Sequence, residues 1–245
     1  GDGSLGDPQG KKDPVAVAHD AQFSLVSVGT NGACALSIEG QPWCWGALSE
    51  RRKTPHPLPV KGKYSWIDVG ESIACGLTEG GSTYCWSLIE STGPYGSEFG
   101  GEIAIADWPE LQQIFVAESV NRGGIIKICG ISDDDKVYCS QSFVSKPFEL
   151  DTTLRFPKIS VGGNHACGLT ETGEAWCWGD NYSGQLGTGT TTPSDSPVKV
   201  RSGMRLIDVS CGPESTCGTT KNGELLCWGK ISFFESFEPL AISSR

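Results

Sequence analysis

The chain has 245 residues, 38% of them hydrophobic, which is enough for one large domain or two small ones with a buried core. Its 29 acidic residues outnumber its 19 basic residues, and a formal charge of -10 is repelled by phosphate backbones and anionic membrane surfaces. No apolar run approaches the roughly 20 residues that a membrane-spanning helix requires. We therefore expect no nucleic acid partner and no direct insertion into a membrane.

Short strands joined by tight turns are the elements that the composition favours. The chain contains 33 glycines and 14 prolines, and long apolar stripes with the helical period of 3.6 residues are missing. These features predict an all-β protein.

Eleven cysteines mark an internal repeat along the chain. Ten of them form five pairs, and the members of each pair are ten residues apart: Cys34 and Cys44, Cys75 and Cys85, Cys129 and Cys139, Cys167 and Cys177, Cys217 and Cys227. A glycine lies five residues before each first cysteine: Gly29, Gly70, Gly124, Gly162 and Gly212. The five copies therefore superimpose, each with a glycine, a cysteine, a turn and a second cysteine in the same order.

Each copy is predicted to form an antiparallel hairpin. If Cys167 faces Cys177, the loop consists of residues 171–173, and Gly173 holds the third loop position, which favours a positive φ. The other copies place Gly40, Gly81, Asp135 and Gly223 at this position. Small residues then face large ones: Ala33 faces Trp45, Ala35 Trp43, Ala74 Trp86, Gly76 Tyr84, Ala166 Trp178, Gly168 Trp176 and Gly218 Leu226, while the bulkier Ile128 faces Ser140. Matched volumes of this kind are expected for cross-strand pairs on one sheet face.

The cysteine spacing favours disulfides over a metal site. Zinc sites favour closely spaced cysteines, whereas this chain has no Cys-x-x-Cys and three histidines, His19, His56 and His165. Cysteines opposed in a non-hydrogen-bonded pair are close enough to bridge, and closing such a loop stabilises the fold by about 2.5 to 3 kcal/mol. We therefore expect a disulfide within each of the five pairs and an oxidising compartment, which means a secreted, cell-surface or periplasmic setting.

Cys211 is the unpaired cysteine of the repeat. It precedes the repeat glycine Gly212, where other copies have Val28, Val69 and Val161. We therefore interpret it as a small buried residue with a free thiol, and an interchain disulfide is the alternative.

Two further apolar stretches precede each hairpin. One ends at the repeat glycine, as in "FSLVSVG" (23–29), "YSWIDVG" (64–70), "FPKISVGG" (156–163) and "RLIDVSCG" (205–212), with "QIFVAES" (113–119) as a degenerate copy. The other is a short strand: "PVAV" at 14, "PLPV" at 57, "EIAI" at 102, "PFEL" at 147, "PVKV" at 197 and "PLAI" at 239. Each unit thus offers up to four short strands.

This arrangement predicts a β-propeller with five visible blades of three to four antiparallel strands, because blades bury their faces by stacking on their neighbours. We expect a single domain over residues 1–245, with repeats at residues 1–46, 47–86, 87–140, 141–179 and 180–229, and with 230–245 closing the ring or starting a further blade. The tryptophans expected in the core between blades are Trp43, Trp45, Trp86, Trp176, Trp178 and Trp228.

One copy closely resembles the repeat of the regulator of chromosome condensation family. Residues 159–200 contain its Gly-Gly-x-His, Trp-Gly-Asp-Asn and Gly-Gln-Leu-Gly elements, at Gly162, Gly163 and His165, at Trp178, Gly179, Asp180 and Asn181, and at Gly184, Gln185, Leu186 and Gly187. The paired cysteines resemble extracellular members, such as bacterial secreted repeat proteins and the crinkly type of plant receptor kinase ectodomain. The resemblance implies a propeller, most often of seven blades. The five hairpins here either close a five-blade ring or form part of a larger one.

The sequence predicts no catalytic centre, no metal site and no cofactor. His19 and His56 lie in polar segments without a nucleophile motif, and His165 belongs to the repeat, as a hydrogen-bonded structural histidine would. Motifs for a phosphate loop, a zinc protease or an EF-hand are absent from the sequence. The acidic run at residues 133–135 is expected at a hairpin tip, which favours solvated charge over bound calcium.

The segments that follow the second cysteines differ from copy to copy, and loops on a rigid scaffold commonly bind ligands. The candidate partner-binding residues are their aromatic side chains: Tyr95, Phe99, Trp108, Tyr182, Phe233 and Phe234. The alternative is that these residues plug the ends of the propeller. Asn181 begins a glycosylation sequon, Asn-Tyr-Ser, which is typical of a secreted eukaryotic chain.

Three functions remain open at this point. The first is an extracellular, non-enzymatic recognition module that binds a protein or peptide through loops on one face. The second is a secreted lectin that binds carbohydrate at one shallow site per blade, although the loops differ between copies. The third, which the family resemblance alone suggests, is a nuclear exchange factor for a small GTPase, and the disulfides and the negative charge disfavour it.

Overall fold

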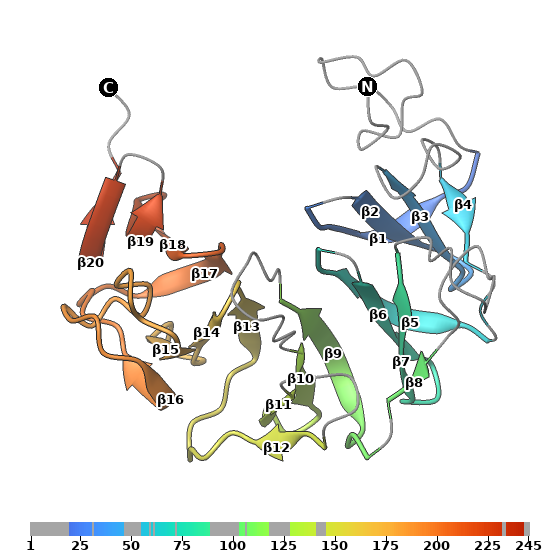
Figure 1. The fold of residues 1–245 in the computed structure, drawn as a ribbon, viewed down its shortest axis with the longest axis horizontal. Coiled ribbons are helices and arrows are strands. Elements are labelled where there is room, and N and C mark those ends of the chain that lie inside the picture. The colour runs from blue at the N-terminus through green and yellow to red at the C-terminus, as the bar shows by residue number, and fades with distance from the viewer. Residues whose placement is uncertain are drawn as a thin grey trace. The chain divides into compact units, whose positions relative to one another are not determined.

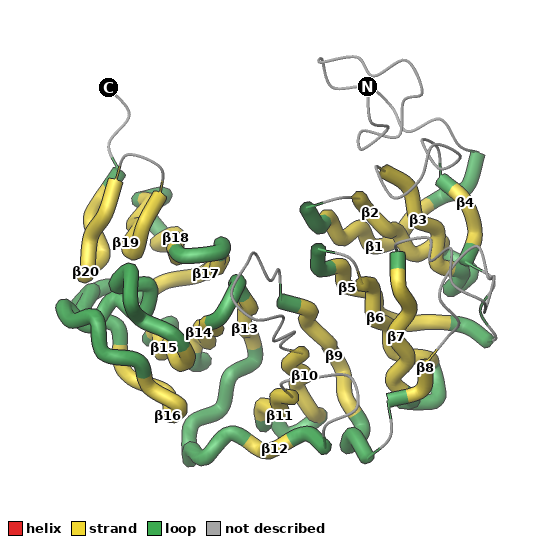
Figure 2. The backbone as a smooth tube through the Cα atoms, in the orientation of Figure 1, coloured by secondary structure: helices red, strands yellow, loops and turns green. Residues whose placement is uncertain are grey.

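The computed structural model describes residues 20–30, 32–46, 55–58, 60, 62–71, 73–88, 103–105, 107–117, 128–140, 146–231 and 234–242. These residues form twenty strands in antiparallel sheets (Figures 1 and 2), so the fold is all-β, of the β-propeller type that the repeat predicts. None of the described residues belongs to a helix that is long and apolar enough to cross a membrane.

The chain divides into two compact units. The first comprises residues 1–116 and 143–146, and the second comprises residues 117–142 and 147–245. The third repeat is divided between them, because its first strand, β9 (Leu111–Val116), belongs to the first unit and its other strands belong to the second.

The first unit contains two four-stranded sheets. Their strands are β1 (Phe23–Val28), β2 (Gly32–Ser37), β3 (Pro42–Gly46) and β4 (His56–Pro57), followed by β5 (Tyr64–Val69), β6 (Ile73–Thr78), β7 (Thr83–Ser87) and β8 (Ile103–Ala104). Each sheet follows chain order. Strands β1 and β2 contact β5, and strands β5 and β6 contact β9, so the sheets pack against the first strand of the next repeat.

The second unit repeats this arrangement. It contains β10 (Ile128–Ser132), β11 (Val137–Ser140) and β12 (Phe148–Glu149), then the sheet of β13 (Lys158–Val161), β14 (His165–Leu169), β15 (Ala175–Gly179) and β16 (Ser194–Lys199), and last the sheet of β17 (Leu206–Cys211), β18 (Ser215–Thr220), β19 (Leu225–Ile231) and β20 (Phe234–Ala241). Strands β13 and β14 contact β17.

The grouping of strands differs from the repeat boundaries expected from the sequence. The short strands β4, β8, β12, β16 and β20 pair with the hairpin that precedes them, whereas the sequence assigned them to the repeat that follows. Within residues 230–245, strand β20 therefore completes the fifth sheet by pairing with β19. The physical reason is that the second strand of each hairpin leaves a free edge, to which the chain returns.

The hairpins have the register that the cysteine spacing predicts. Each first cysteine lies directly opposite its partner, and the structure joins all five pairs by disulfides: Cys34–Cys44, Cys75–Cys85, Cys129–Cys139, Cys167–Cys177 and Cys217–Cys227. The Cα atoms are 4.1 Å apart in Cys34–Cys44 and 4.0 Å apart in Cys167–Cys177. These short separations are those of a non-hydrogen-bonded pair.

The turn residues adopt the expected backbone conformation. Gly173 has φ = 77°, and its N–H donates to the carbonyl of Thr170 at 2.8 Å. In the third copy Asp135 takes the same left-handed conformation with φ = 57°, which aspartate tolerates better than most residues. The three-residue loop with a left-handed last residue is therefore confirmed.

Small residues face large ones in the predicted pairs. Ala33 pairs with Trp45, Ala166 with Trp178, and Ile128 with Ser140. Four of the six tryptophans expected in the core are buried: Trp45, Trp86, Trp178 and Trp228. Trp43 and Trp176 lie nearer the hairpin turns and are half-buried, because the sheet face is covered less completely there.

The disulfide of one sheet lies in a buried cluster with side chains of the next sheet. In the first unit, Cys34 and Cys44 share a cluster with Tyr64, Ile67 and Trp86. In the second unit, Cys167 and Cys177 share one with Val209, Leu226 and Trp228. The core of each unit is therefore formed between sheets.

The repeat glycines lie where neighbouring sheets approach closely. A Cβ atom on Gly29 would overlap the carbonyl oxygen of Gly70, and one on Gly162 would overlap that of Gly212. A side chain of any size would push the sheets apart, so these positions require glycine for space.

A repeated polar link also joins neighbouring sheets. The side-chain oxygen of a serine or aspartate in the first strand of one sheet accepts a hydrogen bond from a backbone N–H in the first strand of the next sheet. The pairs are Ser27 with Val69 (3.0 Å), Asp68 with Val116 (2.7 Å) and Ser160 with Cys211 (2.9 Å). Each link satisfies an amide group that would otherwise lose its hydrogen bond between the sheets.

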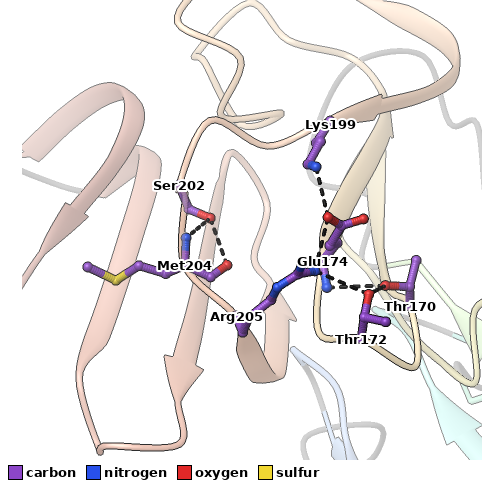
Figure 3. A network of polar contacts seen from close by, with 7 residues as sticks. All are labelled: Thr170, Thr172, Glu174, Lys199, Ser202, Met204 and Arg205. Carbon is purple, nitrogen blue, oxygen red and sulfur yellow. Dashed lines mark hydrogen bonds and ion pairs between the residues drawn. The ribbon is translucent and has the colours of Figure 1, made fainter.

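A polar network joins the hairpin turn of the fourth sheet to the chain entering the fifth (Figure 3). Glu174 Oε1 accepts hydrogen bonds from Lys199 Nζ at 2.8 Å and from Arg205 Nη1 at 2.9 Å. Arg205 also donates to Thr172 Oγ1 at 3.1 Å. The hydrogen bond from Lys199 holds the pKa of Glu174 below its usual range, so the network favours the ionised carboxylate.

Replacing Cys167 and Cys177 together with alanine is expected to lower the free energy of unfolding by about 3 kcal/mol, because the crosslink no longer restricts the unfolded chain. Urea unfolding of the wild-type protein and the double variant measures the difference. Cys211→Ala is the control, because it removes a sulfur atom without breaking a crosslink. Equal losses in the two variants would contradict the stabilising role of the disulfide.

Glu174→Gln is expected to lower the melting temperature slightly at pH 7 and to leave it unchanged at pH 2.5. A carboxylate whose pKa is lowered in the folded state stabilises the fold above its unfolded pKa of about 4.3, and this contribution is lost as the pH falls through the folded value. Thermal unfolding at both pH values checks this, with Glu171→Gln on the same exposed turn as the control. A difference that persists at pH 2.5 would show that the ion pairs are not its cause.

Candidate functional site

The long loop between β15 and β16 is built around Asn181. Its side-chain Nδ2 donates to the carbonyls of Thr190 and Thr192 at 2.9 and 3.0 Å, and its Oδ1 accepts the N–H of Leu186 at 2.9 Å. The side chain is fully buried, at 0% exposure. The sequence marks this residue as a glycosylation acceptor, but a glycan on Nδ2 would have to displace these bonds. In the folded structure the Asn181 side chain holds the loop, and glycosylation at this residue stays a prediction.

This loop covers the fifth sheet. The carbonyl oxygen of Gln185 accepts a hydrogen bond from Trp228 Nε1 at 2.8 Å and another from the Thr216 hydroxyl at 2.9 Å. Leu186 is fully buried in the cluster that contains Trp228. The Gly-Gln-Leu-Gly element therefore packs into the junction between the fourth and fifth repeats.

A cavity of about 300 Å³ lies between the third and fourth repeats. The third repeat contributes the Cys129–Cys139 disulfide, Ser140 and Phe148. The fourth contributes His165, Ala166, Trp178, Gly179 and Asp195. The lining is mostly apolar and has a carboxylate and a hydroxyl among its groups, a combination that favours ligand binding.

Sequence reasoning did not select Phe148 or Asp195 as site residues. One signal was available, because seven residues separate Cys139 from Pro147 of the following short strand, whereas nineteen separate Cys177 from Pro197 of the equivalent strand. A shorter connection has fewer side chains with which to cover the neighbouring sheet.

A second cavity, of about 320 Å³, lies in the first unit beside Trp108. It is formed by the turn at residues 80–84 and by Ala104, Ile105, Trp108 and Glu110. Thr83 Oγ1 and Trp108 Nε1 are buried, and neither has a hydrogen-bond partner among the described residues. Trp108 as a whole is half-buried and forms part of the cavity wall.

The candidate partner-binding residues fall into three groups. Tyr182 is 69% exposed on the long loop of the second unit. Trp108 lines the cavity of the first unit, and Phe234 begins β20. Tyr95, Phe99 and Phe233 lie outside the described residues. The structure therefore does not gather the candidates described into one site.

His165 is part of a structural hydrogen-bond chain. Its Nε2 lies 2.8 Å from Thr216 Oγ1, and the Thr216 hydroxyl donates its proton to the Gln185 carbonyl. Thr216 can then only accept from the histidine, so we assign the His165 proton to Nε2. Among the other two histidines, His56 is exposed on β4, and His19 lies outside the described residues.

The ligand atoms of His165, Cys167 and Cys211 lie within 4.8 Å of one another. Cys167 is bonded to Cys177, which leaves one imidazole and one thiol, fewer than the three or four protein ligands of a zinc site. Of the acidic residues at the tip of the third hairpin, Asp134 is engaged locally, because it accepts a hydrogen bond from the Ser132 hydroxyl at 2.7 Å and pairs with Lys136.

The Cys211 thiol is held in its neutral form. Burial raises its pKa to about 12. The residue is half-buried and packs against the buried cluster of the fourth and fifth sheets, whereas the sequence predicts a buried residue there. A thiol with such a pKa is a poor nucleophile at neutral pH, because the thiolate is the reactive form.

Iodoacetamide at pH 8 is expected to leave the folded protein unlabelled, because only about one Cys211 in ten thousand is a thiolate at that pH. In denaturant without reductant, one label is expected, and after reduction eleven, which counts ten disulfide cysteines and Cys211. Mass spectrometry of the labelled chain measures the number. More than one label before reduction would contradict the disulfide assignment.

Sequence patterns of a known repeat family match the fourth and fifth repeats. The sequence pattern described as the Regulator of chromosome condensation (RCC1) repeat matches residues 158–185 and 206–232, and a second pattern of the same name matches residues 172–218. The human E3 ubiquitin-protein ligase HERC2 is 35% identical over 87 residues, which are 34% of this chain and 2% of that protein.

Solved structures share the fold over most of the chain. Prp20p from Saccharomyces cerevisiae, which was solved in a study that also treats its binding to Gsp1p and histones, superimposes with a TM-score of 0.74 at 16% identity, over 93% of this chain and 65% of Prp20p. The ectodomain of the Physcomitrella patens receptor kinase CR4 gives a TM-score of 0.57 at 19% identity, over 90% of this chain and 53% of that one. The chain spans less than two thirds of the length of each of these proteins.

The sequence pattern, the repeated four-stranded sheets and the disulfides agree with one another. Residues 158–232 therefore contain repeats of the regulator of chromosome condensation type, the described residues have the fold of a β-propeller, and each described hairpin is closed by a disulfide.

Proposed function

We propose that this chain is a single propeller domain that serves as an extracellular, non-enzymatic recognition module for a protein or peptide. The observation that carries the proposal is the cavity beside Trp178, in which apolar side chains and the Asp195 carboxylate line one hollow of about 300 Å³. A hollow of this size suits one or two side chains of a bound peptide.

The scaffold around the cavity supports this function. Five disulfides hold the hairpins, and rigid sheets present loops that differ in sequence between copies, a design that lowers the entropy lost on binding. The disulfides also support an oxidising location outside the cell. Tyr182, exposed on the long loop, supplies an aromatic contact of the kind enriched in protein interfaces.

The interactions of similar proteins point in the same direction. Prp20p is described with binding to Gsp1p and histones, and CR4 is a receptor kinase whose ectodomain has this fold. Protein binding is therefore compatible with the fold.

A phage-displayed peptide library selected on the disulfide-intact protein is expected to yield enriched peptides. Their affinity should vanish when the protein is reduced and alkylated, because the loops then lose their scaffold. Tyr182→Ala should weaken peptides that contact the long loop by about tenfold, as loss of an aromatic anchor does. Met204→Ala, another exposed apolar side chain of the second unit, is the control.

Two outcomes would contradict the proposal. One is a failure to enrich any peptide together with binding on a glycan array that free sugar competes away, which would indicate a lectin. The other is peptide binding that is equally strong after reduction, which would show that the folded loops are not involved.

A further inference from the structure

Two equivalent sites lie at successive repeat junctions of the second unit. Cross-strand pairing fixes the equivalence: His165 with Gly179 and Ala166 with Trp178 in the fourth sheet, and Ser215 with Gly229 and Thr216 with Trp228 in the fifth. The first set lines the cavity, and the second set lies beneath the chain's own loop. The group that occupies the fifth-sheet site therefore indicates which kind of group fits the cavity.

The occupant of the fifth-sheet site is the turn at Gln185 and Leu186. The Gln185 carbonyl accepts hydrogen bonds from Trp228 and Thr216. A Cβ atom on Gly229 would lie 3.2 Å from Gln185 Cα, so the backbones are in close contact. Leu186, which is fully buried, belongs to the cluster of Trp228 and the Cys167–Cys177 disulfide of the preceding sheet.

The fourth-sheet site has corresponding walls, and none of the described residues forms such a turn over it. The corresponding disulfide is Cys129–Cys139, and Phe148, paired with Cys139, takes the place that Val198, paired with Cys177, has in the next repeat. The connection from β11 to β12 has seven residues (141–147), whereas that from β15 to β16 has fourteen (180–193). Among the described residues, Trp178 has no hydrogen-bond acceptor of the kind that Trp228 finds in Gln185.

We infer that the cavity beside Trp178 binds a turn of a partner protein that mimics the chain's own Gln185–Leu186 turn. A leucine-sized side chain lies between Phe148, the Cys129–Cys139 disulfide and Trp178, and a backbone carbonyl of the turn accepts the Trp178 indole N–H. This inference rests on the proposed recognition function and names the chemistry of the partner.

The cavity also sets the charge of the partner. Asp195 lies exposed at its lining, and the chain carries a formal charge of -10. A lysine or arginine beside the leucine therefore pairs with Asp195 and is attracted by the net charge, with an effect that falls as salt increases.

The probe for this site is a cyclised peptide with the sequence Lys-Ser-Gly-Gln-Leu-Gly-Thr, measured by isothermal titration calorimetry on the disulfide-intact chain. The wild-type chain is expected to bind it, and a peptide with serine in place of leucine is expected to bind at least about tenfold more weakly. Phe148→Ala should weaken binding by about tenfold as well, because Phe148 forms one apolar wall.

The matched control is Phe237→Ala. Phe237 is 42% exposed and Phe148 is 49% exposed, and Phe237 does not line the cavity, so its loss should leave the affinity unchanged. Asp195→Asn should weaken binding of the lysine peptide and reduce its salt dependence, while the affinity for a peptide without lysine stays unchanged. Thermal unfolding of each variant confirms that both phenylalanine variants remain folded.

Undetectable binding to the wild-type chain, or equal binding of the leucine and serine peptides, would overturn the inference. So would an affinity that Phe148→Ala and Phe237→Ala reduce equally. If library-selected peptides bind and are indifferent to Phe148→Ala, the recognition function stands and this site assignment fails, so the two proposals can fail separately.

Discussion

Packing of a disulfide against the next sheet is the interaction on which the described core depends. A single four-stranded sheet leaves apolar side chains on both faces, and they become buried only when another sheet covers them. In the described clusters, Cys34–Cys44 and Cys167–Cys177 lie against the following repeat. The disulfide thus acts twice, because it restricts the unfolded hairpin and also supplies a dry, compact surface for the neighbour.

Close approach between sheets is the second constraint. Gly29 and Gly162 allow one backbone to reach the next, and serine or aspartate side chains then accept the amide protons that lie at the contact. The close contact between backbones restricts which residues can occupy these positions. The loops that follow the hairpins lie away from this contact and are less restricted. The fold therefore restricts residue choice mainly in the first strand of each sheet and at the glycine that follows it, while the loops can differ in sequence and length.

The features that follow from short-range spacing could be predicted from the sequence. Ten residues between cysteines fix the register, the turn length and the left-handed residue, because all of them lie within one hairpin. The phase of the fourth strand could not be predicted, since β16 pairs with β15 across a loop whose length differs in every copy. Asn181 shows the same limit, because a three-residue sequon says nothing about the loop that buries the side chain.

The residues that line the cavity could not be predicted from sequence motifs. Its lining is shared by two repeats, and the connection from β11 to β12 has seven residues, whereas the connection from β15 to β16, which places Leu186 beside Trp228, has fourteen. In the next repeat that leucine is part of the chain, and its contacts hold two sheets together. When the same contacts are offered by a different molecule, the packing energy that stabilises one junction becomes binding energy at the other. On the inference drawn above, the fourth-sheet junction offers to a partner the contacts that the chain makes with its own loop at the next junction.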